Sequence, residues 1–170
     1  MSVLDNSGQS LKLEPVPIAE LLNDSARAHR NQFIKANIEF TLKLAPDLPI
    51  VQADGVRLLR LLDNLLTNAR HHVNDGGTVS LAAERKDDHI QIDVIDSGHG
   101  MSAEDASSVF DRYYRGDGPR TRGSRGTGLG LPISRAIAQA HGGELTVDSR
   151  EGEGSTFSIM IPIQQPPLDL

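Results

Sequence analysis

The 170-residue sequence contains no cysteine and no tryptophan, and only 4% of its residues are aromatic. The absence of cysteine excludes disulfides, thiolate metal sites and cysteine nucleophiles, and it fits a reducing compartment. No uninterrupted apolar run approaches the roughly 18 to 20 residues that a membrane-spanning helix needs. The first ten residues contain neither a basic region nor an apolar run, so they do not have the pattern of a signal peptide. Any core must therefore hold by packing alone.

The charge balance is acidic, with 17 lysines and arginines against 23 acidic residues and a net charge of −6. This balance argues against a nucleic-acid interface over the whole surface, so we expect no nucleic-acid partner. One local basic patch stands out, because Arg115, Arg120, Arg122 and Arg125 are accompanied by a single acid, Asp117. Such a patch favours an anionic ligand. The length and the 38% hydrophobic content indicate one globular domain.

Five segments alternate apolar and polar residues with a period of two, which is typical of strands that bury one face. Strands covered on both faces would be continuously apolar, so the alternation indicates a mostly antiparallel sheet. Turn residues at 86–88 and 151–154 predict two hairpins, over 79–95 and 145–163. The apolar positions of the five segments are Ile38, Phe40, Leu42 and Leu44; Val79, Leu81 and Ala83; Ile90, Ile92 and Val94; Leu145 and Val147; and Phe157, Ile159 and Ile161.

Helical spacing of apolar residues predicts helices over 18–36, 55–73 and 128–141, the last ended by two glycines. A short helix is expected after Ser102, where Asp105 would complete an analogue of the capping box. Together these elements predict an α/β fold, a two-layer sandwich. Its mixed, mostly antiparallel sheet of about five strands would be covered on one face by three helices.

Three groups of residues could carry chemistry. Six glycines between 116 and 130 are typical of a phosphate-binding loop, and Pro132 requires a helix to begin close to Gly130, although an ordinary flexible loop fits equally well. Asp96 follows a predicted strand and could accept a hydrogen bond from an exocyclic amine, although Asp-Ser-Gly is also a plain turn. Asn64 and Asn68 share one helical stripe, and an amide oxygen suits Mg²⁺; a solvated polar face is the alternative.

Four segments, in this order, make the sequence similar to a known family. They are Asn-Leu-Leu-Thr-Asn-Ala at 64–69, Asp-Ser-Gly-His-Gly-Met at 96–101, Phe-Asp-Arg-Tyr-Tyr-Arg at 110–115 and Gly-Thr-Gly-Leu-Gly-Leu at 126–131. Together they resemble the catalytic, ATP-binding domain of sensor histidine kinases in the GHKL superfamily. The likeness extends over about 14–163 and includes His-Gly-Gly-Glu-Leu at 141–145 and the final predicted strand.

The resemblance implies a role for each matching residue. Asn68 would bind Mg²⁺, Asn64 would lie near the phosphates, and Asp96 would accept from the adenine amine. Gly98 and Gly100 would shape the adenine pocket, Thr156 would support adenine through water, and residues 115–125 match the mobile ATP lid. Catalysis is assigned to Asn64, Asn68 and Arg115, and nucleotide binding to Asn64, Asn68, His71, His72, Asp96, Gly98, Gly100, Tyr114, Arg115, Gly126, Thr127, Gly128, Leu129, Gly130, Leu131 and Thr156.

The sequence departs from the family after Asn68-Ala69. The family usually has a lysine for the phosphates and an aromatic residue beside the adenine, where this sequence has His71 and His72. Imidazoles can serve both purposes more weakly, and binding through His71 would depend on pH near neutrality. Alternatively, both histidines are simply exposed polar residues.

The resemblance also implies cofactors and partners. The cofactors would be ATP and Mg²⁺, and the activity would be that of a protein-histidine kinase whose phosphoacceptor is absent from this chain. Residues 1–13 would be a linker from the missing dimerisation and phosphoacceptor helices, residues 14–163 the catalytic domain, and residues 164–170 a loose tail. Those helices and a response regulator would be the partners, this fragment would be monomeric alone, and its location would be cytoplasmic, even if the full-length protein were an inner-membrane sensor. An ATP-hydrolysing clamp of the same superfamily and a non-catalytic nucleotide-binding module are the alternatives.

Overall fold

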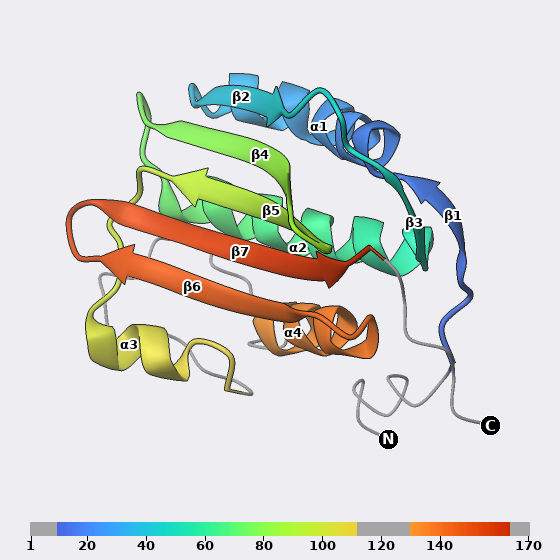
Figure 1. The fold of residues 1–170 in the computed structure, drawn as a ribbon. Helices are drawn as coiled ribbons and strands as arrows, with labels where there is room; N and C mark the ends of the chain where they lie inside the picture. The colour runs from blue at the N-terminus through green and yellow to red at the C-terminus, as the bar shows by residue number, and fades with distance from the viewer. Residues whose placement is uncertain (1–9, 112–129, 164–170) are drawn as a thin grey trace.

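The computed structural model describes residues 10–111 and 130–163, and its main feature is a five-stranded sheet with helices on one face (Figure 1). The strand order is β2-β4-β5-β7-β6. Strand β2 runs parallel to β4 and every other neighbouring pair is antiparallel, which confirms the predicted mixed, mostly antiparallel sheet. The bounds are β2 (Glu39–Leu44), β4 (Thr78–Lys86), β5 (His89–Asp96), β6 (Glu144–Arg150) and β7 (Gly154–Pro162).

Three helices form the second layer, and α2 (Gly55–His72) lies between α1 (Ile18–Lys35) and α4 (Gly130–Ala140) behind the sheet (Figure 1). The short helix α3 (Ala103–Ser108) packs beside β6, and the side chain of Ser102 caps it as predicted, accepting from the Asp105 backbone at 3.1 Å. The helices at 18–36 and 55–73 were predicted one residue too long at their ends. Within the described residues, no helix is both long and apolar enough to cross a membrane.

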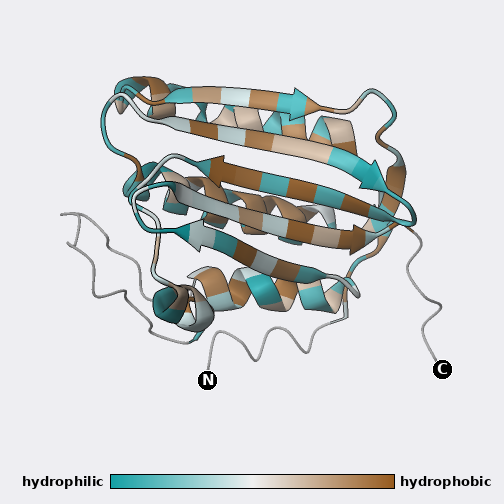
Figure 2. Ribbon diagram, turned by 60° about the vertical axis from the view of Figure 1, so that its left-hand side comes forward, coloured by the Kyte–Doolittle hydropathy of each residue, from teal (hydrophilic) through white to brown (hydrophobic). Residues whose placement is uncertain are grey.

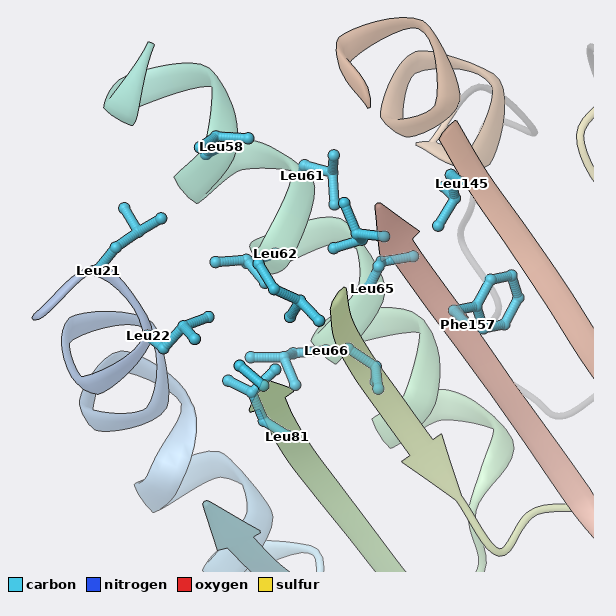
Figure 3. Close-up of a cluster of buried hydrophobic side chains, with 14 of the residues drawn as sticks. Leu21, Leu22, Leu58, Leu61, Leu62, Leu65, Leu66, Leu81, Leu145 and Phe157 are labelled. Carbon is cyan, nitrogen blue, oxygen red and sulfur yellow. The ribbon is translucent and has the colours of Figure 1, made fainter. Parts of the chain in front are cut away.

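The core forms between the two layers because apolar residues recur with the period of each element. In Figure 2 the hydropathy alternates along the strands, and in Figure 3 the leucines of α2 point toward the sheet and toward α1. Leu65 and Leu66 are fully buried among them. This packing holds α2 rigidly across the sheet and so fixes where its remaining side chains lie. The labelled side chains of the cluster are Leu21, Leu22, Leu58, Leu61, Leu62, Leu65, Leu66, Leu81, Leu145 and Phe157.

A second, two-stranded sheet was not predicted. Strand β1 (Glu14–Pro17) pairs antiparallel with β3 (Ile50–Ala53) beside the beginning of α2. The four residues of β3 are too few for a periodic signal to emerge from the sequence. The ribbon matters for the site because it leads the chain directly into the N-cap of α2, Asp54, whose side chain accepts from the Arg57 backbone at 3.2 Å.

A buried histidine joins the beginning of α2 to the end of α4. His141 is fully buried; its Nε2 accepts from the Asp54 backbone N–H at 3.0 Å, and its Nδ1 donates to Ile137 O at 2.8 Å. These two contacts require a neutral ring with its proton on Nδ1. Burial is the largest cause that lowers the pKa of His141. The predicted glycines follow, and Gly142 has a φ of +78°, as a helix C-terminus commonly requires.

Candidate functional site

Helix α2 presents a polar, half-buried face as well as its leucines. On this face Asn64 donates from Nδ2 to Ser134 Oγ at 3.2 Å and to Gly130 O at 3.4 Å. The amide therefore ties the middle of α2 to the first turn of α4, next to the predicted phosphate loop. The predicted site residues on this face of α2 are Asn64, Asn68, His71 and His72.

The side chain of Asn68 contacts one histidine, which in turn contacts a second histidine. Its Oδ1 lies 3.1 Å from His72 Nε2, and His72 Nδ1 lies 3.0 Å from His99 Nε2. The two rings meet edge to face, with centroids 5.0 Å apart and an interplanar angle of 73°. His99 Nδ1 in turn lies 2.9 Å from Gly100 O. A continuous chain of contacts therefore runs from α2 to the loop after β5.

Asp96 is the buried carboxylate of the site. It follows Val94 on the core-facing row of β5, is only 5% exposed, and its Oδ1 accepts from the Gly98 backbone at 2.9 Å. Burial raises the pKa of Asp96, while backbone hydrogen bonds from Gly98 and Ser155 and the nearby His99 act in the opposite direction. A buried carboxylate that accepts hydrogen bonds is suited to a ligand that donates one, such as an exocyclic amine.

The structure brings Ser155, and not Thr156, to Asp96. Ser155 lies directly opposite Asp96 in the β5–β7 pair and is 8% exposed, and its hydroxyl is 2.7 Å from that of Ser149. Thr156 lies opposite Ile95, and successive residues of a strand point to opposite faces of the sheet. Counting back by two from the buried Phe157 would have identified Ser155 in the sequence, whereas nothing in the sequence indicated Ser149.

Three glycines allow the loop after β5 to pack closely against two other segments. A Cβ added at Gly98 would lie 2.4 Å from His72 O, and one at Gly100, which has a φ of +68°, would lie 1.9 Å from Arg150 O. A Cβ at Gly154 would lie 2.0 Å from the backbone oxygen of Asp96. These contacts are with protein backbone, so the glycines hold Asp96 next to α2 by permitting close approach.

The neighbouring histidines on α2 have depressed basicity. Burial lowers the pKa of His72 to about 4, with additional contributions from His99 and His71. Burial also lowers the pKa of His71, and the charge of Arg70 acts in the same direction. Both rings are therefore neutral at pH 7, so His71 carries no positive charge comparable to that of a lysine before a ligand binds.

Of the remaining predicted site residues, some lie within the described part of the chain and others lie outside it. Gly130 is exposed at the beginning of α4 with open space around its α-carbon, and Leu131 beside it is half-buried. Gly130 is the first residue of this helix that the structure describes. The predicted residues that lie outside the described part of the chain are Tyr114, Arg115, Gly126, Thr127, Gly128 and Leu129, together with the predicted ATP lid at 115–125.

The polar side chains of this site fit a bound ligand that shares a metal ion better than a metal site formed by protein residues alone. Among the described residues, no group of three or more histidine, cysteine, aspartate or glutamate side chains could hold a metal ion. Mg²⁺, however, commonly takes only one or two protein ligands and completes its shell with water and substrate phosphates. The amide of Asn68 fits that role, and the buried Asp96 fits an amine-bearing base.

Comparison with known proteins agrees with this geometry. The model of the family described as "Histidine kinase-, DNA gyrase B-, and HSP90-like ATPase" matches residues 53–165, more than half of the chain. The sensor histidine kinase WalK of Bacillus subtilis is 39% identical over 132 residues, covering 76% of this chain and 21% of WalK. The sensor protein SrrB of Staphylococcus aureus is 33% identical over 159 residues, covering 94% of this chain and 27% of SrrB. The chain thus spans about a quarter of the length of these relatives.

Solved structures show the same fold. The catalytic domain of the histidine kinase ThkA superposes with a TM-score of 0.80 at 26% identity, covering 91% of this chain and 98% of that domain. Full-length ShkA, solved in complex with AMPPNP, gives a TM-score of 0.81 at 28% identity over 93% of this chain and 32% of ShkA. The chain therefore belongs to the family of histidine kinase-, DNA gyrase B- and HSP90-like ATPases, and within it to the catalytic domains of sensor histidine kinases.

Proposed function

We propose that this domain binds Mg-ATP between α2, the loop after β5 and the beginning of α4. It would donate the γ-phosphate to a histidine on a separate dimerisation domain of the same sensor kinase. The observation that carries the proposal is the buried carboxylate of Asp96 at the end of β5, held by the Gly98 backbone at 2.9 Å beside the polar face of α2. A response regulator would then take up the phosphoryl group.

Recognition of the base rests on Asp96. An ionised carboxylate accepts from the amine of adenine but meets a second acceptor in the carbonyl of guanine. Ser155 lies opposite Asp96 on β7, so its hydroxyl can support the same edge of the base directly or through water. We assign this supporting role to Ser155 in place of Thr156.

The phosphates would lie toward the beginning of α4, where Asn64 ties α2 to Gly130 and Ser134. Asn68 would hold Mg²⁺ through its amide oxygen, and the ion would neutralise charge on the transferring phosphoryl group. In the transfer step a nitrogen of the acceptor histidine forms a bond to the γ-phosphorus. The bond from that phosphorus to the ADP oxygen breaks, and ADP leaves with the electron pair.

The residue at position 64 supports the kinase proposal over the hydrolytic alternative. ATP-hydrolysing clamps of this superfamily carry a glutamate four residues before the metal-binding asparagine, as a general base for water. Here that position is Asn64, a neutral amide whose nitrogen donates to Ser134 and Gly130. An amide cannot take a proton from water at neutral pH, so the site positions ATP without activating a water molecule.

Radiolabelled ATP tests the proposal with three samples: the chain alone, a helical fragment that carries the acceptor histidine alone, and the two mixed. We expect label on the helical fragment only in the mixture, because positioning of the reactants is the missing contribution. The chain alone should neither label itself nor release phosphate rapidly. Asn68→Asp should weaken both binding and transfer, because it places an anion beside the phosphates.

The two alternatives predict different results. Steady phosphate release by the chain alone would favour the hydrolytic clamp and contradict the kinase assignment. Binding of Mg-ATP with no transfer in any mixture would instead favour a non-catalytic nucleotide-binding module. A matched control is His89→Ala, because the His89 side chain contacts the exposed Asp88 side chain and lies at the other end of β5 from Asp96.

A further inference from the structure

Two histidines from different segments contact each other at the site. His72 is on the last turn of α2 and His99 is on the loop after β5, 27 residues later. Their ring nitrogens face each other at 3.0 Å, and the other nitrogen of each ring also has a partner, Asn68 Oδ1 at 3.1 Å or Gly100 O at 2.9 Å. Four groups from two segments therefore form one unbroken chain.

The direction of the hydrogen bonds follows from the end of this chain at Asn68. An amide oxygen can only accept, so His72 Nε2 donates to it. His72 Nε2 therefore carries a proton. His72 Nδ1 lies 3.0 Å from His99 Nε2, so one of these two nitrogens donates to the other. His99 Nδ1 lies 2.9 Å from Gly100 O and donates to it, because a carbonyl oxygen can only accept.

This arrangement removes an ambiguity at Asn68. The terminal torsion of an asparagine has two nearly equivalent orientations, which exchange its amide oxygen and nitrogen. Only the orientation with the oxygen toward His72 Nε2–H makes the observed hydrogen bond. The oxygen keeps a second lone pair for a metal ion, as in metal sites where an outer residue orients a ligand.

We propose that His72 is a positioning residue that orients the amide of Asn68 for Mg²⁺, and that His99 holds His72 in place. The chain of contacts thereby couples the metal ligand on α2 to the loop that carries Asp96. This inference rests on the proposed function, because it takes Asn68 as the magnesium ligand.

The alternative is a filling role, in which the two rings only pack against their neighbours and do not orient Asn68. Both roles would make substitution of His72 harmful, but they differ in what is lost. A filling role supports binding of the nucleotide with or without magnesium. A positioning role supports only the part of the affinity that Mg²⁺ adds.

The experiment measures the dissociation constant of ADP by calorimetry, once with Mg²⁺ and once with a chelator, for four variants. ADP is used because it binds without turnover. His72→Phe keeps an aromatic ring of similar size and removes both nitrogens. His72→Gln keeps a nitrogen donor that can reach Asn68. His99→Ala removes the second ring. His89→Ala is the matched control, because His89 is also a histidine and lies at the other end of β5 from Asp96.

For the wild-type chain we expect ADP to bind more tightly with Mg²⁺ than without it. His72→Phe should lower this magnesium-dependent gain about tenfold, while the affinity without Mg²⁺ does not fall. His72→Gln should restore most of the gain, His99→Ala should lose part of it, and His89→Ala should behave as wild type. Thermal unfolding of each variant, measured in parallel, checks that it is folded.

Three results would overturn the inference. His72→Phe could keep the full gain, it could lose affinity equally with and without Mg²⁺, or His72→Gln could fail to restore what His72→Phe loses while remaining folded. A different result bears on the proposed function itself. If the wild-type chain binds ADP equally well with and without Mg²⁺, Asn68 is not a magnesium ligand, and both proposals fail.

Discussion

The two faces of helix α2 are built on different principles. On the core face Leu61, Leu65 and Leu66 are completely buried and contact other apolar side chains without any directional requirement. On the polar face Asn64, Asn68 and His72 are half-buried, and each makes hydrogen bonds to one or two specific atoms. The core face thus stabilises the fold through packed volume, and the polar face presents a few groups in fixed orientations. Substitutions on the first should change stability, and substitutions on the second should change ligand binding.

The largest expected effect is on the core face. Leu65→Ala removes a fully buried side chain between the helical layer and the sheet, and it should lower the free energy of unfolding by about 3 kcal/mol. Leu59 on the same helix is 38% exposed, so Leu59→Ala should cost less than about 1 kcal/mol. Urea denaturation of both variants measures the difference. Equal losses would contradict the claim that burial in the core determines how much each leucine of α2 stabilises the fold.

Asp96→Asn should have the largest effect on binding. It replaces a charged acceptor with an amide and removes a hydrogen bond worth about 1.5 to 3 kcal/mol, so ATP should bind about tenfold to a hundredfold more weakly. The free energy of unfolding should change much less, because burial already raises the pKa of Asp96 and thereby disfavours its charged form. Calorimetry and urea denaturation on the same variant separate the two effects. A large loss of stability with unchanged affinity would assign Asp96 to the core instead.

Folding stability should fall as the pH falls from 6.5 toward 4. In this range the unfolded chain protonates its histidines, while the folded chain holds His72, with a pKa of about 4, and His141 neutral. A folded pKa below the unfolded value contributes stability that is present above pH 6.5 and lost as the pH falls. The raised pKa of Asp96 acts in the opposite direction, from its unfolded pKa near 3.8 up to its folded value.

We therefore expect the free energy of unfolding to be about 2 kcal/mol lower at pH 5 than at pH 7. Urea denaturation at pH 7, 6 and 5 measures this slope, and His72→Phe should reduce it. Stability that is constant or higher at pH 5 would show that these histidines can be protonated without cost in the folded chain.

The smallest effect concerns His71. Burial and Arg70 lower its pKa, so it is neutral at pH 7 and contributes little charge to phosphate binding. His71→Lys should tighten ATP binding about threefold, which is the scale of one partly exposed ion pair. The wild-type affinity should also rise as the pH falls from 7 to 6, because a bound phosphate favours the protonated imidazole, whereas the lysine variant should change less. Parallel pH slopes for the two proteins would place His71 away from the phosphates.

Regular, repeated features of the sequence were enough to predict most of the fold. The period-two runs identified all five strands of the main sheet, and leucines spaced along 55–73 identified α2, because each repeat reflects a buried face. Strand β3 was missed, since four residues carry no reliable period and its pairing with β1 bridges more than thirty residues. The hydrogen bond between Asp54 and His141 could not be predicted either, because it joins residues that are far apart in the sequence and meet only in the folded chain.

The motifs predicted which residues form the candidate site, but not how they contact one another. Asn64 and Asn68 lie on α2, and Asp96 lies at the end of β5, whose following loop contacts α2 through His99 and His72. The strand register, however, brings Ser155 to Asp96 in place of Thr156. The contact between His72 and His99 was invisible in the sequence, because it depends on how close the loop approaches α2, which the missing side chain of Gly98 permits.

The most direct test of the central claim is a comparison of base preference in the wild-type chain. Calorimetric titration with non-hydrolysable analogues of ATP and GTP, both with Mg²⁺, measures whether this corner is an adenine nucleotide site. The buried acceptor Asp96 predicts that the ATP analogue binds at least about tenfold more tightly, since guanine would leave two acceptors facing each other. Equal affinity for the two analogues, or no binding of either, would contradict the account.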